Sequence, residues 1–176
     1  MKPLRIALVA DFLEEGWPSM DLVADMLLDR LRVEHASAVS VELVRPGLRR
    51  RASLLPGKIP FNMDRVLNRF WDYPRTVSKL TGSFDVFHIV DHSYAQLVHS
   101  LPAERTLVTC HDLDTFRSVL QPAFERRSLP YRVMARRILE GLRAAGHIAC
   151  DTEATRDALV RQVGVSPSRT TVVHNG

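Results

Sequence analysis

The 176-residue chain is long enough to bury a hydrophobic core and suits a single domain. Its hydrophobic share of 45% and its charged share of 25% lie near globular averages, which excludes disordered and fibrous proteins. No apolar run approaches the roughly 18 residues of a membrane span, and the first ten residues lack the pattern of a secretory leader. We therefore expect a globular protein that folds from residue 4 and stays in the cytoplasm.

The net charge of +4 is unevenly spread along the chain. Residues 45–80 hold nine basic and two acidic residues, so the remainder is slightly acidic. A basic segment attracts anionic partners, and it predicts a peripheral contact between residues 45–80 and the inner face of an anionic membrane. The alternative is a helix packed on the core with a solvated charged side. Because no recognition motif accompanies the charges, we predict no nucleic-acid partner.

Cys110 and Cys150 are the two cysteines, and each ends an apolar, strand-like run. The sequence has no Cys-x-x-Cys pair, so neither a disulfide framework nor a zinc cluster is indicated. We expect two free thiols and no metal site.

The first 60 residues begin with an alternation of strand and helix. Residues 4–10 are typical of a buried strand, and the apolar–polar alternation of residues 39–44 indicates a strand nearer the sheet edge. Between them, Pro18 is suited to open a helix, and its apolar residues recur at helical spacing: Met20, Val23, Leu27 and Leu31. Residues 45–60 are rich in proline, glycine and arginine and predict a long surface loop.

The second part of the chain continues the alternation. Asn62 is a candidate N-cap of a helix whose apolar side carries Val66, Leu67, Phe70 and Trp71, and Pro74 should end or kink that helix. Strands are predicted at residues 85–90, 106–110, 147–150 and 170–173, and helices at residues 94–101, 131–145 and 153–163. Val133, Ile138 and Leu142 are expected to share one side of the long helix, and Gly146 to close it. Repeated strand–helix–strand order predicts an α/β, Rossmann-like parallel sheet flanked by helices.

Ionisable residues follow two of the predicted strands. Asp91 and His92 come after residues 85–90, and His111 and Asp112 come after residues 106–110. In open α/β sheets, ligands gather outside the carboxyl ends of the strands, so these residues are candidates for a binding or catalytic site. The alternative is that they only cap and order the turns that follow the strands.

Gly16 lies in the loop between the first strand and the first helix. The N-terminus of a helix offers unpaired N–H groups to a phosphate, although a turn of this kind also needs a glycine for steric reasons alone. Both interpretations remain open from these features.

Four segments, in this order, resemble the N-terminal half of a retaining glycosyltransferase of the GT-B fold, in glycosyltransferase family four. They are the Gly16 loop, residues 85–92 (Asp-Val-Phe-His-Ile-Val-Asp-His), residues 109–112 (Thr-Cys-His-Asp), and residues 151–156 together with 171–176. The resemblance implies that residues 1–176 form one Rossmann-like, acceptor-binding domain. It also implies that a nucleotide-sugar domain, absent from this chain, follows Asn175-Gly176.

The resemblance assigns roles to single residues. His111 is the implied catalytic residue and approaches the transferred sugar, while Gly16 and Trp17 approach the donor phosphates. The acceptor side then carries Asp91, His92 and Asp112, of which Asp112 is also expected to order its turn. The implied donor is a nucleotide-sugar, which is a co-substrate and needs no metal, and the implied acceptor is a saccharide or a lipid-linked molecule.

These implications lead to one expected function and one alternative. We expect the chain to be half of a retaining glycosyltransferase that transfers a sugar to an acceptor hydroxyl, and to be inactive without its donor domain. The alternative is a GT-B-like module that binds or interacts without catalysis.

Overall fold

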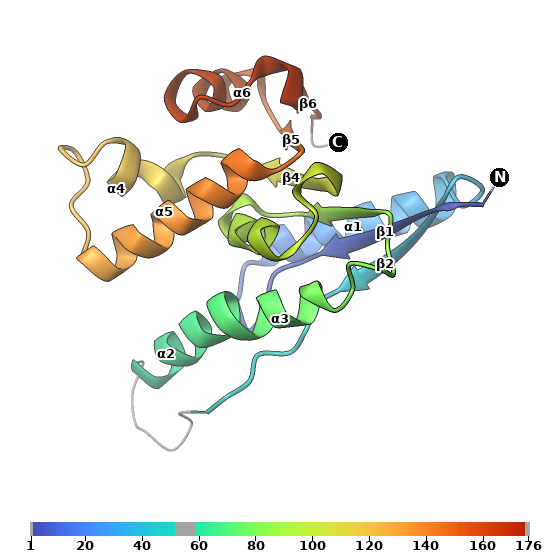
Figure 1. Ribbon diagram of the computed structural model, residues 1–176, viewed down its shortest axis with the longest axis horizontal. Helices are drawn as coiled ribbons and strands as arrows, with labels where there is room; N and C mark the ends of the chain where they lie inside the picture. Colours follow the sequence, from blue (N-terminus) through green and yellow to red (C-terminus); the bar gives the residue numbers. More distant parts are fainter. Residues whose placement is uncertain (1, 52–58, 175–176) are drawn as a thin grey trace. The chain divides into compact units, whose positions relative to one another are not determined.

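The computed structural model describes residues 2–51 and 59–174 (Figure 1). Strands and helices alternate along the chain, and the strand order of the sheet is β2-β1-β3-β4-β5-β6. The predicted α/β, Rossmann-like parallel sheet is therefore confirmed. The internal contacts fall into two compact units, residues 1–87 and residues 88–176, with strand β3 (Val86–Ile89) at their boundary. Each unit is described by itself below.

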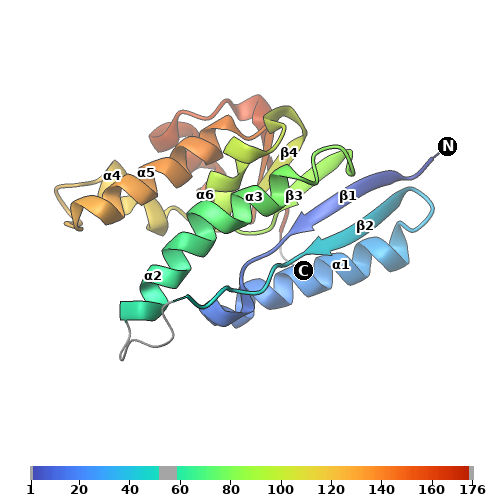
Figure 2. The same cartoon turned by 60° about the horizontal axis from the view of Figure 1, so that its bottom comes forward.

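Unit 1 is built on two parallel strands joined by a helix. β1 (Leu4–Val9) pairs with β2 (Val39–Val44) in the register Leu4↔Val39 to Val9↔Val44. The helix α1 (Pro18–Glu34) connects them and runs alongside both (Figure 2), and Pro18 opens it as predicted. Its buried residues are Ala24 and Leu28. The predicted stripe of Met20, Val23, Leu27 and Leu31 is half-buried around them, so the helix orientation is confirmed.

A long helical arm follows in unit 1. It consists of α2 (Ile59–Leu67), a π-helical turn (Asn68–Asp72) and α3 (Tyr73–Ser78). Asn62 does not cap it, because the helix begins before this residue. Pro74 does not end it either. The turn before the proline widens to π geometry, in which the Tyr73 N–H donates to the Asn68 carbonyl five residues earlier.

The helical arm buries polar residues and exposes apolar ones. Asp64 and Asn68 are 2% and 1% exposed, whereas Val66, Leu67 and Trp71 are 37%, 43% and 58% exposed. These three apolar side chains therefore do not pack on the core. Phe70 is half-buried and Tyr73 is buried, so the alternative of a helix packed on the core holds for part of the arm. The buried polar side chains instead bind the backbone of Arg49 and Arg51, which runs past the arm.

Unit 2 contains the parallel strands β4 (Thr106–Cys110), β5 (His147–Cys150) and β6 (Thr170–Val172). Two helices accompany them, α5 (Leu129–Ala144) and α6 (Glu153–Ala158), the second of which continues as a π turn to Val163. Gly164 ends that helix with a positive φ of 77°, as C-terminal glycines do. The short α4 (Arg117–Leu120) lies in the connection between β4 and α5 (Figure 1).

The long helix α5 packs closely against the 3₁₀ segment His92–Ser100. At Gly141 the approach is so close that a Cβ atom would lie 2.0 Å from the carbonyl oxygen of Ala95. Ile138 and Leu142 are buried as predicted, but Val133 is exposed. Gly146 does not close the helix by a left-handed turn. Its N–H donates to the carbonyl oxygen of Ala103 at 2.7 Å, where a side chain would collide with backbone.

Candidate functional site

The carboxyl ends of the strands in unit 2 bring five ionisable residues together. We call them the strand-end cluster: Asp91, His92, His111, Asp112 and Asp151. Four of them were predicted from the sequence. Asp151 belongs to the segment 151–156 of the family resemblance, but no site role was predicted for it. Cys110 lies opposite Cys150 in the parallel ladder, so the residues that follow are neighbours. The register of the two strands is the signal that identifies Asp151.

His111 is held by protein groups around its whole ring. Its Nε2 lies 3.2 Å from the Val90 carbonyl oxygen, and its Nδ1 lies 3.7 Å from Asp151 Oδ2. The His111 carbonyl accepts a hydrogen bond from Thr155 Oγ at 3.1 Å, and the side chain is only 11% exposed. The geometry therefore fixes the orientation of this imidazole and leaves it a small exposed edge.

His92 is buried between two carboxylates. Its Nδ1 lies 3.3 Å from Asp91 Oδ1, and its Nε2 lies 3.6 Å from Asp112 Oδ1. Burial lowers the pKa of His92, but the nearby carboxylates of Asp112 and Asp91 outweigh it, so the pKa lies above its usual value. The cluster therefore favours the protonated form of His92.

Asp112 is the member of the cluster that is most open to solvent, with a side-chain exposure of 55%. The nearby His92 ring lowers the pKa of Asp112 to about 2, so Asp112 is ionised at neutral pH. Its Oδ1 also accepts the N–H of Asp114 at 2.8 Å, which is the turn-ordering contact expected from the sequence.

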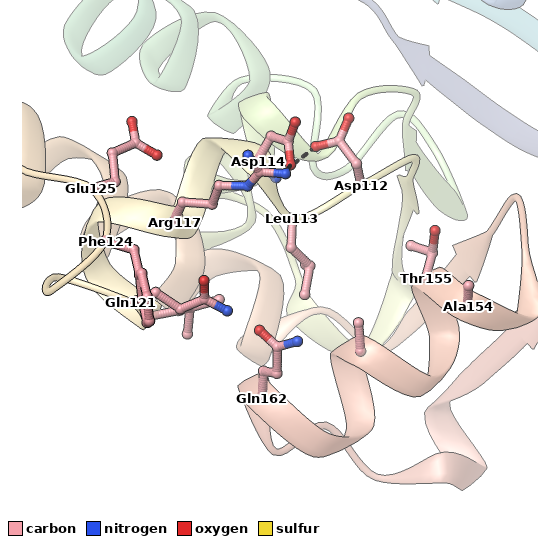
Figure 3. A pocket seen from close by; sticks show the side chains of 12 residues that line it. Asp112, Leu113, Asp114, Arg117, Gln121, Phe124, Glu125, Ala154, Thr155 and Gln162 are labelled. Carbon is pink, nitrogen blue, oxygen red and sulfur yellow. Dashed lines mark hydrogen bonds and ion pairs between the residues drawn. The ribbon is translucent and has the colours of Figure 1, made fainter.

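A pocket of about 610 Å³ opens beside Asp112 (Figure 3). One side consists of the connection from β4 to α5, and the other of α6. Its apolar lining residues are Leu113, Leu120, Phe124, Ala154 and Ala158, and its polar ones are Asp112, Asp114, Arg117, Gln121, Glu125, Thr155 and Gln162. No periodic pattern of residues indicates this pocket, because the connection from β4 to α5 is mostly irregular.

In unit 1, the loop that contains Gly16 has a separate geometry. Gly16 adopts a left-handed conformation, with φ of 69°, and Trp17 follows it at the N-cap of α1 with its side chain exposed. The neighbouring acids differ: the exposed Glu14 accepts the N–H of Leu48 at 3.1 Å, and the buried Glu15 carboxylate pairs with Arg69 at 3.2 Å. Both carboxylates therefore contribute to the structure of unit 1.

Several arginines of the basic segment 45–80 form ion pairs within unit 1. Arg45, Arg49, Arg51 and Arg69 each pair with an aspartate or glutamate of unit 1. Arg75 instead stacks on the Trp71 ring at 3.4 Å from its centroid. Lys58 lies outside the described residues. An exposed apolar face with an arginine beside its tryptophan remains on the helical arm.

The thiols of Cys110 and Cys150 are free and buried, as expected. Burial raises the pKa of Cys150 to about 11 and that of Cys110 well above its usual value, so neither is an activated nucleophile. Within residues 2–51 and 59–174, no three His, Cys, Asp or Glu side chains are grouped so that they could hold a metal ion. In the same residues, no helix is long and apolar enough to cross a membrane.

The chain matches the family model described as Glycosyltransferase Family 4 over residues 27–176. It is similar to the crystal structure of LpCGTa in complex with UDP, with a TM-score of 0.53 and 12% sequence identity. The match covers 99% of this chain and 53% of that one, so the chain spans about half the length of this relative. At this identity the similarity shows the fold, which is that of one half of a GT-B glycosyltransferase. No curated protein matches the chain.

Proposed function

The chain belongs to glycosyltransferase family 4, and on that premise we propose that it is the acceptor-side half of a retaining enzyme. In this proposal a nucleotide-sugar donor, bound by a C-terminal domain, gives its sugar to an acceptor hydroxyl without a metal. The UDP named in the LpCGTa structure supports a donor of this class. The residues expected to open the linker to that domain, Asn175-Gly176, lie outside the described residues.

The strand-end cluster is the observation that carries the proposal. Sugar transfer with retention passes through a sugar with positive charge at its anomeric carbon, so fixed negative groups nearby lower the barrier. Asp112 and Asp151 supply such groups, and Asp151 with the Val90 carbonyl fixes the ring of His111. We assign to His111 the contact with the transferred sugar, and to Asp91, His92 and Asp112 the acceptor side.

Gly16 and Trp17 are assigned to the donor phosphates. The Gly16 N–H donates to the Leu13 carbonyl and Pro18 has no N–H, so the groups that would bind a phosphate are the N–H groups of Trp17 and Ser19 at the start of α1. The charge of Glu15 is neutralised by Arg69, and Glu14 is held by the Leu48 N–H. The competing function is a GT-B-like binding module without catalysis. The two are distinguished by whether the longer protein that carries both halves transfers a sugar.

The test of the catalytic assignment uses that two-domain protein. His111→Ala should lower kcat/KM by at least about 100-fold, as expected when a group that contacts the transition state is lost. His111→Gln places an amide donor near the position of Nε2 and so keeps a donor for the Val90 carbonyl. Thermal unfolding of both variants separates a catalytic loss from an unfolded protein. His35→Ala, at an exposed position of unit 1, is the control. Full activity of His111→Ala would overturn the assignment.

A second proposal concerns the helical arm, which we assign to an anionic membrane surface. Met63, Val66, Leu67 and Trp71 are exposed along one helix, and the segment that contains it has an excess of arginine. A helix of this kind lies in the lipid interface with its apolar side down and its basic residues at the headgroups. This is the peripheral contact predicted from the basic charge of residues 45–80.

Vesicle co-sedimentation tests this surface. Binding to phosphatidylglycerol vesicles at low salt should exceed binding to phosphatidylcholine vesicles and weaken as salt is added. Trp71→Ala should reduce it about tenfold, whereas Val33→Ala, which removes a still more exposed apolar side chain on α1, should leave it unchanged. Equal binding by the two variants, or none by the original chain, would contradict the proposal.

A further inference from the structure

The pocket beside Asp112 is formed by unit 2 alone, so its lining can be interpreted without reference to unit 1. From that lining we infer that the pocket is a subsite for a neutral saccharide, with a pyranose ring stacked on Phe124 and its hydroxyls bound by Gln121 and Gln162. The inference rests on the proposed function only where it calls this saccharide the acceptor. The family match leaves the chemical class of the acceptor open, and the lining of the pocket is the basis on which we name that class.

Phe124 is the first part of the argument. Its side chain is 90% exposed, more than any other large apolar side chain of the described residues. It stands on a wall of the pocket, opposite Ala154 and Thr155 at the start of α6 (Figure 3). One face of a pyranose is a flat array of C–H groups, which packs on an exposed aromatic ring and removes both apolar surfaces from water.

The amides of Gln121 and Gln162 are the second part. Both side chains line the pocket, and within the described residues neither side-chain amide has a protein hydrogen-bond partner. Each amide offers two donors and an acceptor, which matches vicinal hydroxyls that donate and accept at once. The carboxylate of Asp112, ionised at neutral pH, adds acceptors for hydroxyl groups.

The charge of the lining selects against an anionic ligand. Three carboxylates, those of Asp112, Asp114 and Glu125, stand against the single guanidinium of Arg117. That guanidinium is engaged by Asp114 at 2.7 Å, and Glu125 is paired with Arg127 at 2.7 Å. A phosphate or a uronate would meet net negative charge and no free cation in the lining, whereas an uncharged sugar meets hydrogen-bonding groups. The volume of about 610 Å³ lies within the range of small-molecule sites.

Saturation-transfer NMR on the 176-residue chain tests the inference. The neutral probes are methyl α-D-glucoside, methyl α-D-galactoside, methyl α-D-mannoside and N-acetylglucosamine, and the anionic probes are glucose 6-phosphate and glucuronate. At least one neutral probe should bind with a millimolar Kd, and the anionic probes should bind more weakly. Absence of binding by all four neutral probes, or tighter binding of an anionic one, would overturn the inference.

Variants then place the bound sugar. Phe124→Ala should weaken binding of the best neutral probe about tenfold, since an aromatic face contributes on that scale. Phe124→Tyr keeps the aromatic ring and should bind this probe as the original chain does. Leu129→Ala removes another exposed apolar side chain just beyond this connection and should change nothing. Unchanged binding in Phe124→Ala would overturn the stacking. These binding measurements need no donor domain. A neutral sugar can therefore bind even if the two-domain protein transfers none, and the two-domain protein can transfer a sugar even if this pocket binds none.

Discussion

The helical arm of unit 1 and the strand-end cluster of unit 2 use polar side chains in opposite ways. In the arm, Asp64 and Asn68 are buried and bind backbone groups of the passing chain, and the apolar side chains are exposed. In the cluster, the polar side chains bind one another, and Asp112 also reaches a pocket. The buried polar groups of the arm thus stabilise the fold, whereas those at the strand ends form a candidate site for chemistry.

The largest expected effect concerns the support beneath the cluster. Gly141→Ala places a Cβ 2.0 Å from the Ala95 carbonyl oxygen, in the 3₁₀ segment that begins with His92. The backbone must move, and overpacking of this kind costs about 3 kcal/mol or more of unfolding free energy. Urea unfolding measures the loss, and the amide signals of His92 and His111 should shift together.

Gly82→Ala is the matched control in unit 1. A Cβ at Gly82 meets nothing within 4 Å and its φ is not positive, so this substitution should be neutral or slightly stabilising. If Gly141→Ala were as mild as Gly82→Ala, the cluster would not depend on the close approach of α5, and its geometry would have another origin.

The next effect is the loss of stability between about pH 6.5 and 4, where histidines titrate. It should come from outside the arm, since the arm contains no histidine. Burial lowers the pKa of His88 on β3 to about 4, below the value of about 6.5 in an unfolded chain. The unfolded state therefore takes up the proton first, and stability falls as pH decreases from 6.5 to 4, by up to about 3 kcal/mol.

His88→Gln should remove this part of the pH dependence and keep a hydrogen bond to Thr109, whose hydroxyl lies 2.7 Å from His88 Nε2. Unfolding free energies of the variant and the original chain are compared at several pH values from 4 to 7. Parallel curves would show that His88 does not contribute to the acid sensitivity.

The third prediction removes the hydrogen bonds that Asn68 makes in the helical arm. The Asn68 side chain accepts the Arg49 N–H at 2.8 Å and donates to the carbonyls of Arg49 and Asp64. Asn68→Ala leaves these buried groups unpaired and should cost about 2 kcal/mol of unfolding free energy. Asn62→Ala, on the same helix but exposed, should stay within about 0.5 kcal/mol. Equal effects of the two would mean that the buried polar face does not hold the arm.

The strands were predictable because period and length identify them. All six predicted strands are present, with ends within one residue of the prediction, since apolar β-branched runs bounded by turn residues leave few alternatives. The edge position of residues 39–44 also agrees with the strand order. The order of strand ends along the chain was enough to predict His92 and His111 as neighbours at one edge.

What the sequence did not predict depends on long-range partners. The orientation of the helical arm is set by the backbone of residues 49–51, and no local period reveals that this backbone needs Asp64 and Asn68 as acceptors. Gly146 looked like a helix end, but it is required where two backbone segments approach. The pocket was missed because it is formed by an irregular connection and by a helix more than 25 residues later.

The smallest expected effect is a change of proton affinity within the cluster. Asp112 and Asp91 raise the pKa of His92 above its usual value, so His92 contributes stability that is complete below about pH 6.5 and is lost as pH rises through its folded-state pKa. NMR titration of the His92 ring should show this raised pKa.

Asp112→Asn should lower the pKa of His92, because the variant keeps the shape of the side chain and removes the charge 3.6 Å from Nε2. Asp114→Asn removes a charge from the same pocket and should shift the pKa of His92 much less, since Asp114 is not among the groups that raise it. If the pKa of His92 were the same in Asp112→Asn, other contacts would hold the proton of the cluster. The distinction between paired polar groups at the strand ends and buried polar groups in the arm would then lose its electrostatic basis.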